Sequence, residues 1–461
     1  MAFLLQMPKG ADLHNHLSGA VYAESYIEWS AKAGLCVDQR TFYLLKPPCD
    51  EPVGHLPVSM ALINPVLYRQ IIDAWSMRNW QFSGQNGHDH FFDAFGKFDL
   101  ATIGHLGAML AEELSRAAKG HVIYLELMLT PDKGSSSQIG QKVGWDGGFE
   151  STLLKLRANN IIEAAVRGEE ILRDAETQKN RLLKCGTPEA DPGCAVTVRY
   201  IFQVSRGAPL GQVYAQMVTG FMMADEPRSN VVALNLVQAE DGLSSMQNFS
   251  VEMQMLNFLH PLYPGAHITL HAGELAPGIV SPDRLSYHIR DSVEVGHAER
   301  IGHGVAIMHE NNPDDLLREL ARRNVMIEIC LTSNDLILGI HGNQHPLATY
   351  IEYGVPVALA TDDEGVSRSE ISREYLKAVE EQDLGYVQLK TMARTSLQYA
   401  FISGSSLWSD AKKFIPIPRC AKENLGQAPL SKGCQQFLAG SEKARLQWEL
   451  EKELTTFESQ Y

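Results

Sequence analysis

Histidine and carboxylate residues recur in this chain at the ends of short apolar runs. The first such segment is Lys9–Gly19, in which Asp12 to His16 has the pattern of a β-strand. Because successive side chains of a strand point to opposite faces, His14 and His16 point the same way. Two imidazoles on one face at a strand end are typical of a metal site, although a polar strand end can also carry two histidines by chance.

Three later motifs favour the metal interpretation: His271-Ala-Gly-Glu274, Gly302-His303-Gly304 and Thr361-Asp362-Asp363. With His14 and His16, the residues His271 and Asp362 complete a set of three nitrogens and one oxygen that suits Zn²⁺. Such an ion lowers the pKa of a bound water towards neutrality. The apolar run 231–237 contains no lysine that could bridge two ions, so we expect one zinc ion per chain.

The remaining polar residues of these motifs have expected roles in catalysis. Glu274 follows His271 by three residues and is free to act as an acid. His303 could hold or deprotonate the water. Asp363 stands next to the ligand but faces differently, so we expect it to bind substrate. Each residue alone could be a satisfied buried polar group, but together they indicate a metal-dependent hydrolase.

These motifs need a scaffold that brings distant segments together. Helical segments alternate with the predicted strands, which indicates a parallel sheet, and eight units predict a closed α/β barrel of the (β/α)₈ or TIM type. The histidines and aspartates then lie at the C-terminal ends of strands, where barrel enzymes carry their chemistry. The predicted strands are 12–16, 121–130, 197–204, 231–237, 267–270, 300–302, 325–331 and 356–361.

Further segments flank this barrel. We expect the end of a helix at 1–7, helices at 20–35 and 60–80, and a proline-rich loop at 36–57. Phe91, Phe92, Phe95 and Phe98 form one helical stripe, which indicates either core packing or a lid that lines a pocket mouth.

The C-terminal residues extend beyond the barrel. We divide the chain into a barrel domain, 1–403, and an extension, 404–461. In the extension, Ser441 to Phe457 predicts a charged amphipathic helix. Its apolar side could pack on its own barrel, which we favour, or on a second subunit.

Composition and net charge limit the classes of molecule that the chain can bind. The chain has 461 residues, 44% of them hydrophobic, and a formal net charge of -15. This charge argues against nucleic acid and against an anionic membrane surface, and it favours a small neutral or cationic substrate. No apolar run approaches the roughly 18 residues of a membrane span. The oligomeric state stays open.

Six of the seven cysteines form local pairs, and Cys330 is left alone. They are either free thiols of a cytoplasmic enzyme or disulfides of a periplasmic or secreted one. The segment 1–7 lacks a basic leader and a cleavage site, so it is not a signal peptide, and the chain could be truncated or processed. The pairs are Cys36 with Cys49, Cys185 with Cys194, and Cys420 with Cys434.

From about Pro8 to Ser367 the chain resembles the adenosine deaminase family of metal-dependent hydrolases. The resemblance rests on motifs that occur in the family's order: Pro8-Lys9, Asp12-Leu-His-Asn-His-Leu17, His271-Ala-Gly-Glu274, Arg300-Ile-Gly-His-Gly304, Ser333-Asn334, His345-Pro346 and Thr361-Asp-Asp363. The Ser-Asn and His-Pro pieces, His88-Asp-His-Phe-Phe92 and the cysteine pairs resemble the secreted adenosine-deaminase-related growth factors and their bacterial relatives.

The resemblance implies a reaction. A water molecule activated by zinc attacks carbon 6 of a purine, Glu274 protonates N1, and ammonia leaves. His303 orients the water, and Asp363 is the hydrogen-bond partner of N7. The substrate is then a small purine nucleoside: adenosine, 2′-deoxyadenosine or a related aminopurine nucleoside.

The chain departs from the cytosolic family at three positions. Ser18 replaces an aspartate that contacts ribose, Gln238 replaces a glycine near purine N3, and Glu364 replaces a proline. We therefore expect Ser18 and Gln238, with Phe91 and Phe95, to contact the substrate. Two alternatives stay open: another one-metal barrel hydrolase, acting on a cyclic amide or an ester, and a growth-factor-like binding protein that has lost the chemistry.

Overall fold

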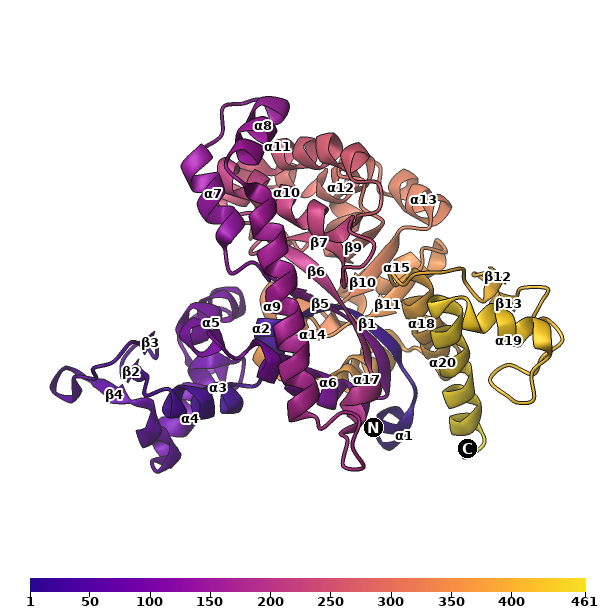
Figure 1. The fold of residues 1–461 in the computed structure, drawn as a ribbon, viewed down its shortest axis with the longest axis horizontal. Helices are drawn as coiled ribbons and strands as arrows, with labels where there is room; N and C mark the ends of the chain where they lie inside the picture. The colour runs from indigo at the N-terminus through magenta and orange to yellow at the C-terminus, as the bar shows by residue number, and fades with distance from the viewer.

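The computed structural model describes all residues from 1 to 461 and has an eight-stranded parallel sheet at its centre (Figure 1). The strands follow one another around the sheet in chain order. They are β1 (Gly10–His16), β5 (Val122–Leu129), β6 (Thr197–Ser205), β7 (Val231–Val237), β8 (His267–Ala272), β9 (Arg300–His303), β10 (Met326–Ile329) and β11 (Val357–Leu359).

The sheet closes between its first strand and the residues after its last strand. Asn15 and Asp362 form an isolated parallel bridge. The N–H of His16 donates to the carbonyl of Asp362 at 2.9 Å, and the N–H of Asp362 donates to the carbonyl of His14 at 2.8 Å. The predicted (β/α)₈ barrel is therefore confirmed, and its closure lies at predicted site residues.

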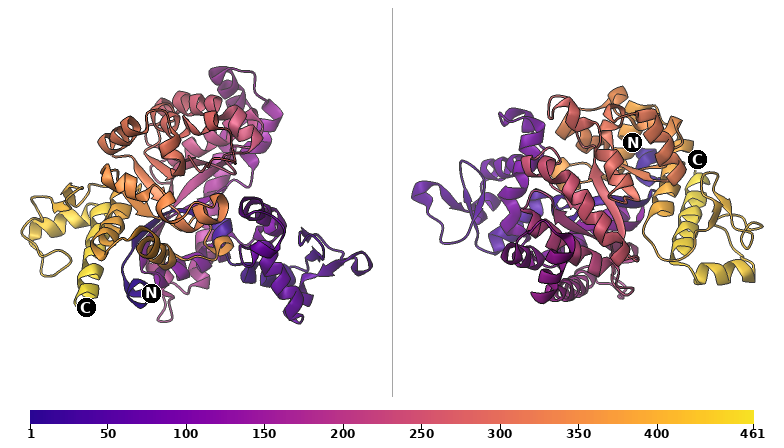
Figure 2. Two further views of the ribbon diagram at one scale, coloured as in Figure 1. Left: turned by 180° about the vertical axis from the view of Figure 1, so that it is seen from behind. Right: turned by 90° about the horizontal axis from the view of Figure 1, so that it is seen from above.

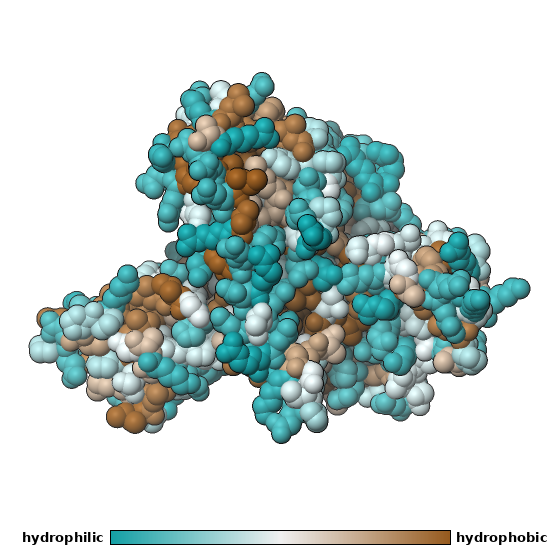
Figure 3. Space-filling model, viewed as in Figure 1, coloured by the Kyte–Doolittle hydropathy of each residue, from teal (hydrophilic) through white to brown (hydrophobic).

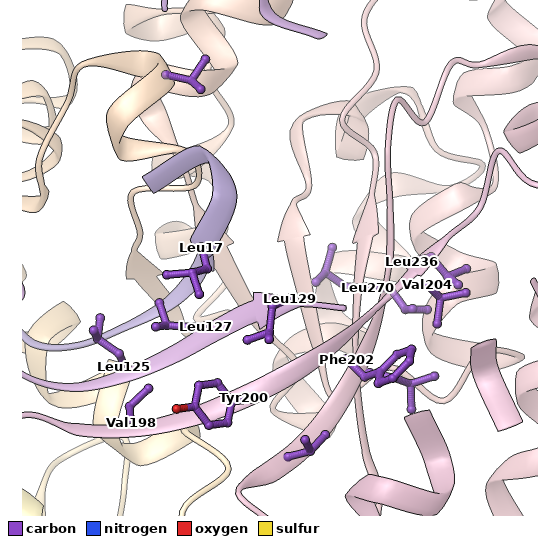
Figure 4. Packing of buried hydrophobic residues seen from close by; sticks show 14 of the residues in the cluster. Leu17, Leu125, Leu127, Leu129, Val198, Tyr200, Phe202, Val204, Leu236 and Leu270 are labelled. Atoms are coloured by element: carbon purple, nitrogen blue, oxygen red, sulfur yellow. The ribbon is translucent and has the colours of Figure 1, made fainter. Parts of the chain in front are cut away.

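Alternating side chains of the strands build two apolar layers. In β5, Leu125, Leu127 and Leu129 pack with Val198 and the other outward residues of β6, as Figure 4 shows. The intervening residues of β5, among them Met128, belong to separate clusters inside the barrel. This period of two is the expected arrangement of a strand between a helical layer and a filled interior.

Helices surround the barrel, and their ends follow local sequence signals. The helix over 313–323 begins with a proline, has Asp314 and Asp315 in its first turn and Arg322 and Arg323 in its last, which matches the helix dipole. None of the helices combines the length and apolarity needed to cross a bilayer. The barrel helices are α6 (Leu106–Lys119), α7 (Ser135–Val143), α8 (Phe149–Ala158), α9 (Ile161–Leu182), α10 (Leu210–Ala224), α11 (Leu243–Leu259), α12 (His288–Glu294), α13 (Pro313–Arg323), α14 (Leu331–Leu338), α15 (Leu347–Glu352), α16 (Glu364–Ser367), α17 (Ile371–Gln382) and α18 (Tyr386–Tyr399).

A long excursion separates β1 from α6 and projects from the barrel (Figures 1 and 2). The loop predicted for 36–57 is wrong, because this segment contains a three-stranded antiparallel sheet with strands of two or three residues. Such strands are too short to show alternation. The elements are α1 (Ala2–Gln6) before β1, then α2 (Leu17–Ala20), α3 (Ala23–Lys32), β2 (Cys36–Asp38), β3 (Leu44–Leu45), β4 (His55–Pro57), α4 (Pro65–Trp75) and α5 (Gly87–Thr102).

The excursion also carries exposed apolar side chains. Leu62, Ile63 and Val66 are more than half exposed near the start of α4. Figure 3 shows hydrophobic residues on this projecting part and also on the upper part of the visible face, among largely hydrophilic surroundings.

The C-terminal extension lies on the other side of the barrel (Figure 2). It contains β12 (Trp408–Asp410), β13 (Ile415–Pro416), α19 (Lys432–Ala439) and α20 (Glu442–Glu458). Leu446, Leu450 and Leu454 of α20 pack with Leu397 of α18, and Arg394 contacts Glu451 through hydrogen bonds of 2.6 Å. The division of the chain at residue 403 stays a prediction.

The cysteines form three disulfides in the pairs expected from their spacing. The Cα–Cα distances are 5.4 Å for Cys36–Cys49, 5.5 Å for Cys185–Cys194 and 4.9 Å for Cys420–Cys434. All lie within the range that a disulfide allows. Cys330 is buried and free.

Thiol titration tests this pairing. Unreduced, denatured protein from an oxidising compartment should contain one reactive thiol per chain, because only Cys330 is unpaired, and Cys330→Ser should contain none. Seven reactive thiols in the unreduced protein would contradict the assignment.

Candidate active site

Four predicted ligands converge at the C-terminal mouth of the barrel. The Nε2 atoms of His14 and His16 each lie 3.1 Å from Nε2 of His271. Asp362 Oδ1 lies 3.4 Å from Nε2 of both His14 and His16. All four side chains are largely buried. The structure thus brings together residues that are up to 348 positions apart in the sequence (362 minus 14).

The second nitrogen of each imidazole has an oxygen partner. Nδ1 of His14 lies 2.6 Å from Glu328 Oε2, and Nδ1 of His271 lies 2.9 Å from Asn235 Oδ1. Nδ1 of His16 lies 3.4 Å from Gln203 Oε1. These acceptors favour the tautomer with the proton on Nδ1.

This tautomer leaves three Nε2 lone pairs directed at one region beside a carboxylate. Lone pairs at such separations repel one another unless a cation or proton lies between them. The donor set of three imidazoles and one carboxylate therefore fits a divalent metal ion.

The electrostatics of the set agree with this fit. Burial lowers the pKa of His16 to about 4, so its ring is neutral and able to ligate. Burial also opposes a proton on His14, but Asp362 and Glu328 outweigh it and raise the pKa of His14 to about 10. The two carboxylates thus attract a positive charge to the point where the Nε2 atoms meet.

A chain of buried charges lies beneath His14. Glu328 Oε1 accepts hydrogen bonds from Arg300 Nε at 2.7 Å and from Thr269 Oγ1 at 2.9 Å. Arg300 Nη2 donates to Glu126 Oε2 at 2.6 Å. Burial would raise the pKa of Glu328, but Arg300 and His14 hold it at about 2. Glu328 therefore stays ionised and fixes the His14 ring.

Glu274 lies on the loop that leaves β8, and its backbone is held by Glu240. The N–H groups of Gly273 and Glu274 donate to the Glu240 carboxylate at 3.1 and 2.8 Å, and His288 Nδ1 lies 2.6 Å from it. Burial, with the charges of Asp362 and Glu240, raises the pKa of Glu274 well above its ordinary value. A raised pKa favours the protonated form that a proton donor needs.

His303 lies next to this cluster. Its ring centroid is 4.9 Å from that of His14 and 5.2 Å from that of His271. Its Nδ1 is 2.9 Å from Asn334 Nδ2 and 3.7 Å from Glu274 Oε1. Burial lowers the pKa of His303 to about 4, so the ring is neutral.

Asp363 follows Asp362 but contacts a different part of the site. Its carboxylate approaches Gly19 so closely that a Cβ at residue 19 would overlap it. Asp363 Oδ1 is buried without a hydrogen-bond partner. Burial and the neighbouring charge of Asp362 raise the pKa of Asp363 well above its ordinary value.

Backbone strain gathers at the same strand ends. Gln238, His303 and Asp362 have φ values of +82°, +68° and +61°, which side-chain-bearing residues adopt at a cost of about 1–3 kcal/mol each. Gly302 must also lack a side chain, because a Cβ there would lie 2.5 Å from the His14 ring.

A cavity of about 530 Å³ opens above the cluster. His16, His271, Glu274, Asp362 and Asp363 form part of its lining, and so do the other four predicted substrate contacts. In the stripe on α5, Phe91 and Phe98 are buried, and all four phenylalanines line the cavity. That the stripe acts as a lid stays a prediction. The predicted contacts in the lining are Ser18, Phe91, Phe95 and Gln238.

Other residues of the site were not predicted. Asp99, Thr102, Gln203 and Ser205 also line the cavity. A lone carboxylate in the apolar run of β10 is a visible signal for Glu328, but its pairing with His14 joins residues 314 positions apart. Asn235, Gln203 and Glu240 carry no such signal, whereas Asn334 lies in a motif of the resemblance that came without an assigned role.

Comparisons with known proteins agree with this geometry. The family model described as adenosine deaminase matches residues 100–407. Adenosine deaminase from Salmonella typhimurium is 26% identical over 395 residues, which cover 86% of this chain and 94% of that protein.

Solved structures with lower identity share the fold. The apo structure of the N6-methyl-AMP deaminase from Arabidopsis thaliana aligns with a TM-score of 0.57 at 20% identity, over 87% of this chain and 94% of that one. An amidohydrolase from Burkhoderia ambifaria with bound Zn aligns with a TM-score of 0.55 at 17% identity, over 89% of each chain.

These matches define the class of protein. The chain belongs to the adenosine deaminase family. It is an enzyme that acts on the amino group of a purine, and its substrates are small molecules.

Replacing Glu328 by glutamine tests the contact beneath His14. The substitution keeps the shape but removes the charge that holds His14 Nδ1–H, so metal affinity should fall about 10–100-fold. Competition with a chelating dye measures this affinity. Glu310→Gln is a matched control, because Glu310 is a buried carboxylate that accepts the N–H of Ile289 instead. Equal metal affinity in Glu328→Gln and the wild type would contradict the assigned role.

Proposed function

We propose that the enzyme is a zinc-dependent hydrolase that deaminates adenosine or 2′-deoxyadenosine, or a related aminopurine nucleoside, to the inosine-type product and ammonia. His14, His16, His271 and Asp362 are the proposed ligands of one zinc ion. Zinc bound there would supply a Lewis acid that makes water acidic near neutral pH.

The observation that carries this proposal is the convergence of the three Nε2 atoms beside Asp362 at the floor of a cavity. Borderline nitrogen ligands with one carboxylate suit zinc, and at separations of 3.1–3.4 Å the donor atoms are close enough to one another to share one ion. The cavity above them gives the substrate direct access to this point.

Glu274 is the proposed proton donor to the purine ring. Burial and the neighbouring carboxylates raise its pKa, which favours the protonated carboxyl that a proton donor needs, and its Oε1 is buried without a partner in the protein. A ring nitrogen of the purine would supply that partner and accept the proton. The ring carbon next to this nitrogen then becomes more electrophilic, and the exocyclic amine can leave as ammonia.

Asp363 is the proposed hydrogen-bond partner of a second ring nitrogen of the purine, away from the one that Glu274 protonates. Its unpaired Oδ1 and raised pKa favour a protonated carboxyl that donates to a ring nitrogen such as N7. Because Asp362 and Asp363 are adjacent, one strand end would fix both the ion and the base plane. Phe91 and Phe95 supply apolar surface for the base, and Ser18 and Gln238 supply polar contacts.

The charge of the cavity favours a nucleoside over a nucleotide. None of the residues that line it is lysine or arginine, whereas Asp99, Glu274, Asp362 and Asp363 are acidic. A phosphate group usually needs cationic side chains or a row of backbone N–H groups. We therefore infer that the sugar end of the substrate is uncharged.

We also propose that the enzyme belongs with the secreted adenosine-deaminase-related growth factors and their bacterial relatives, and that it functions in an oxidising compartment. Three disulfides within one chain support an extracellular or periplasmic site.

Glu274→Gln tests the proposed proton donor. Glutamine keeps the shape but cannot cycle a proton, so kcat should fall by at least about 10²-fold, a typical contribution of general acid–base catalysis. Metal content should be unchanged. Glu310→Gln, which removes another buried carboxylate with a raised pKa, should keep near-normal turnover. Near-wild-type turnover of Glu274→Gln would show that Glu274 is not the proton donor. Loss of metal would show instead that Glu274 is a metal ligand.

Comparing adenosine with adenosine 5′-monophosphate tests the inferred substrate. A phosphate in this cavity lies near the Asp99 carboxylate and finds no cationic side chain in the lining, and a close like charge costs at least about 1 kcal/mol, so kcat/KM for the monophosphate should be at least ~10-fold lower. Asp99→Lys should reduce the ratio of kcat/KM for adenosine to kcat/KM for the monophosphate. Asp283→Lys should leave this ratio unchanged, because Asp283 is exposed and lies away from the cavity. A wild-type enzyme that prefers the monophosphate would contradict the inference.

A further inference from the structure

Two consecutive residues of α14 contact two different groups of the candidate site. Ser333 Oγ donates to Asp362 Oδ2 at 2.5 Å, and Asn334 Nδ2 lies 2.9 Å from His303 Nδ1. Asn334 also contacts His345, whose Nε2 is 3.0 Å from Asn334 Oδ1. These residues are buried, and their contacts decide which ring nitrogen of His303 carries its proton.

The direction of each hydrogen bond follows from one backbone donor. The N–H of Leu347 is 3.2 Å from His345 Nδ1. A backbone N–H can only donate, so Nδ1 of His345 accepts and the proton of this ring is on Nε2. That Nε2–H must then donate to the Asn334 amide, which presents its oxygen.

The orientation of the Asn334 amide decides whether Nδ1 of His303 accepts or donates a hydrogen bond. With its oxygen towards His345, the amide directs its N–H at His303 Nδ1, which therefore accepts. An imidazole that accepts at Nδ1 is neutral and has its proton on Nε2. Turning the amide over would place its NH₂ group against the N–H of His345, so two donors would face each other.

The resulting N–H of His303 has no partner in the protein. Nε2 is fully buried and makes no hydrogen bond in the protein. The ring is 4.9 Å from that of His14 and 5.2 Å from that of His271 between centroids, and the carboxyl of Glu274 lies nearest to the other nitrogen, Nδ1, at 3.7 Å. Because a buried unpaired donor is costly, a group bound in the site is expected to accept from it. The oxygen that attacks the purine is such a group.

We propose that Asn334, oriented by His345, is a positioning residue that fixes the proton of His303 on Nε2. His303 then holds the attacking oxygen as a hydrogen-bond donor and does not accept its proton through Nε2. This inference rests on the proposed function and decides between the two roles that the sequence leaves open for His303.

The experiment combines a structural and a kinetic measurement. NMR of protein with isotope-labelled histidine nitrogens distinguishes the two neutral tautomers, and the His303 signals are those lost in His303→Gln. The wild type should show His303 protonated on Nε2. Asn334→Asp offers an acceptor to both histidines, so the proton of His303 should move to Nδ1. A wrong tautomer of a catalytic histidine can cost about 10⁴-fold, and we expect kcat to fall by at least ~10²-fold.

Two further readouts separate positioning from general damage. In Asn334→Asp, KM and bound metal should change less than ~3-fold, because no ligand or substrate contact is removed. Tyr350→Phe is a matched control, since it deletes a buried 2.6 Å hydrogen bond to the carbonyl of Gly304, the residue after His303. It should leave the tautomer and kcat unchanged.

Asn334→Ala is the alternative test of the positioning role if Asn334→Asp does not fold. It removes the donor to Nδ1, so the two tautomers should coexist and kcat should fall. Wild-type His303 protonated on Nδ1, or full turnover in both Asn334 variants, would overturn the proposal. If the wild-type enzyme released no ammonia from any aminopurine nucleoside, the proposed function would fail, while the NMR result would still decide the tautomer.

Discussion

The closure of the barrel is the interaction on which the site depends. Two backbone hydrogen bonds join β1 to Asp362, the residue that follows the last strand by three positions. They place the Asp362 carboxylate beside His14 and His16, and β8 brings His271 to the same point. The final ring-closing contacts of the fold are thus made by the proposed ligands themselves. This arrangement has a cost in folding free energy, because Asp362 has a left-handed backbone and three lone pairs are directed at one region. A bound cation would offset both costs.

Around this point the protein supplies a second set of polar side chains that hold most of the site residues. Glu328 holds His14, Asn235 holds His271, Ser333 holds Asp362, Glu240 holds the backbone of Glu274, and Asn334 contacts His303. Nearly all are buried, so their hydrogen bonds are strong and their loss would be costly. The rings and carboxylates are therefore fixed by packing and hydrogen bonds before a substrate arrives, which is how a site lowers the cost of reorganisation during reaction.

The substrate side of the cavity has a different origin. Its aromatic wall belongs to α5, at the end of the excursion that projects from the barrel. A His88–Asp241 contact of 3.0 Å joins the start of this helix to the loop after β7, which also carries Gln238 and Glu240. The proposed ligands thus lie at the ends of barrel strands, while the aromatic part of the cavity lining comes from an inserted segment.

The sequence predicted the parts that local pattern determines. Alternation placed His14 and His16 on one face, and apolar runs marked all eight strands and the residues at their ends. It could not predict contacts such as that of Glu328 with His14 or of Asn334 with His303, because these depend on which strand ends meet in space. It also failed at 36–57, where strands of two or three residues are set by tertiary pairing and a disulfide.

Anomalous X-ray diffraction at the zinc absorption edge tests the central claim most directly. Crystals of the enzyme purified without chelators should show one peak per chain, surrounded by Nε2 of His14, His16 and His271 and by Asp362 Oδ1. A metal–nitrogen distance of about 2.0–2.1 Å is expected for each histidine. No peak at this point, or two peaks within the site, would contradict a single-metal centre formed by barrel closure.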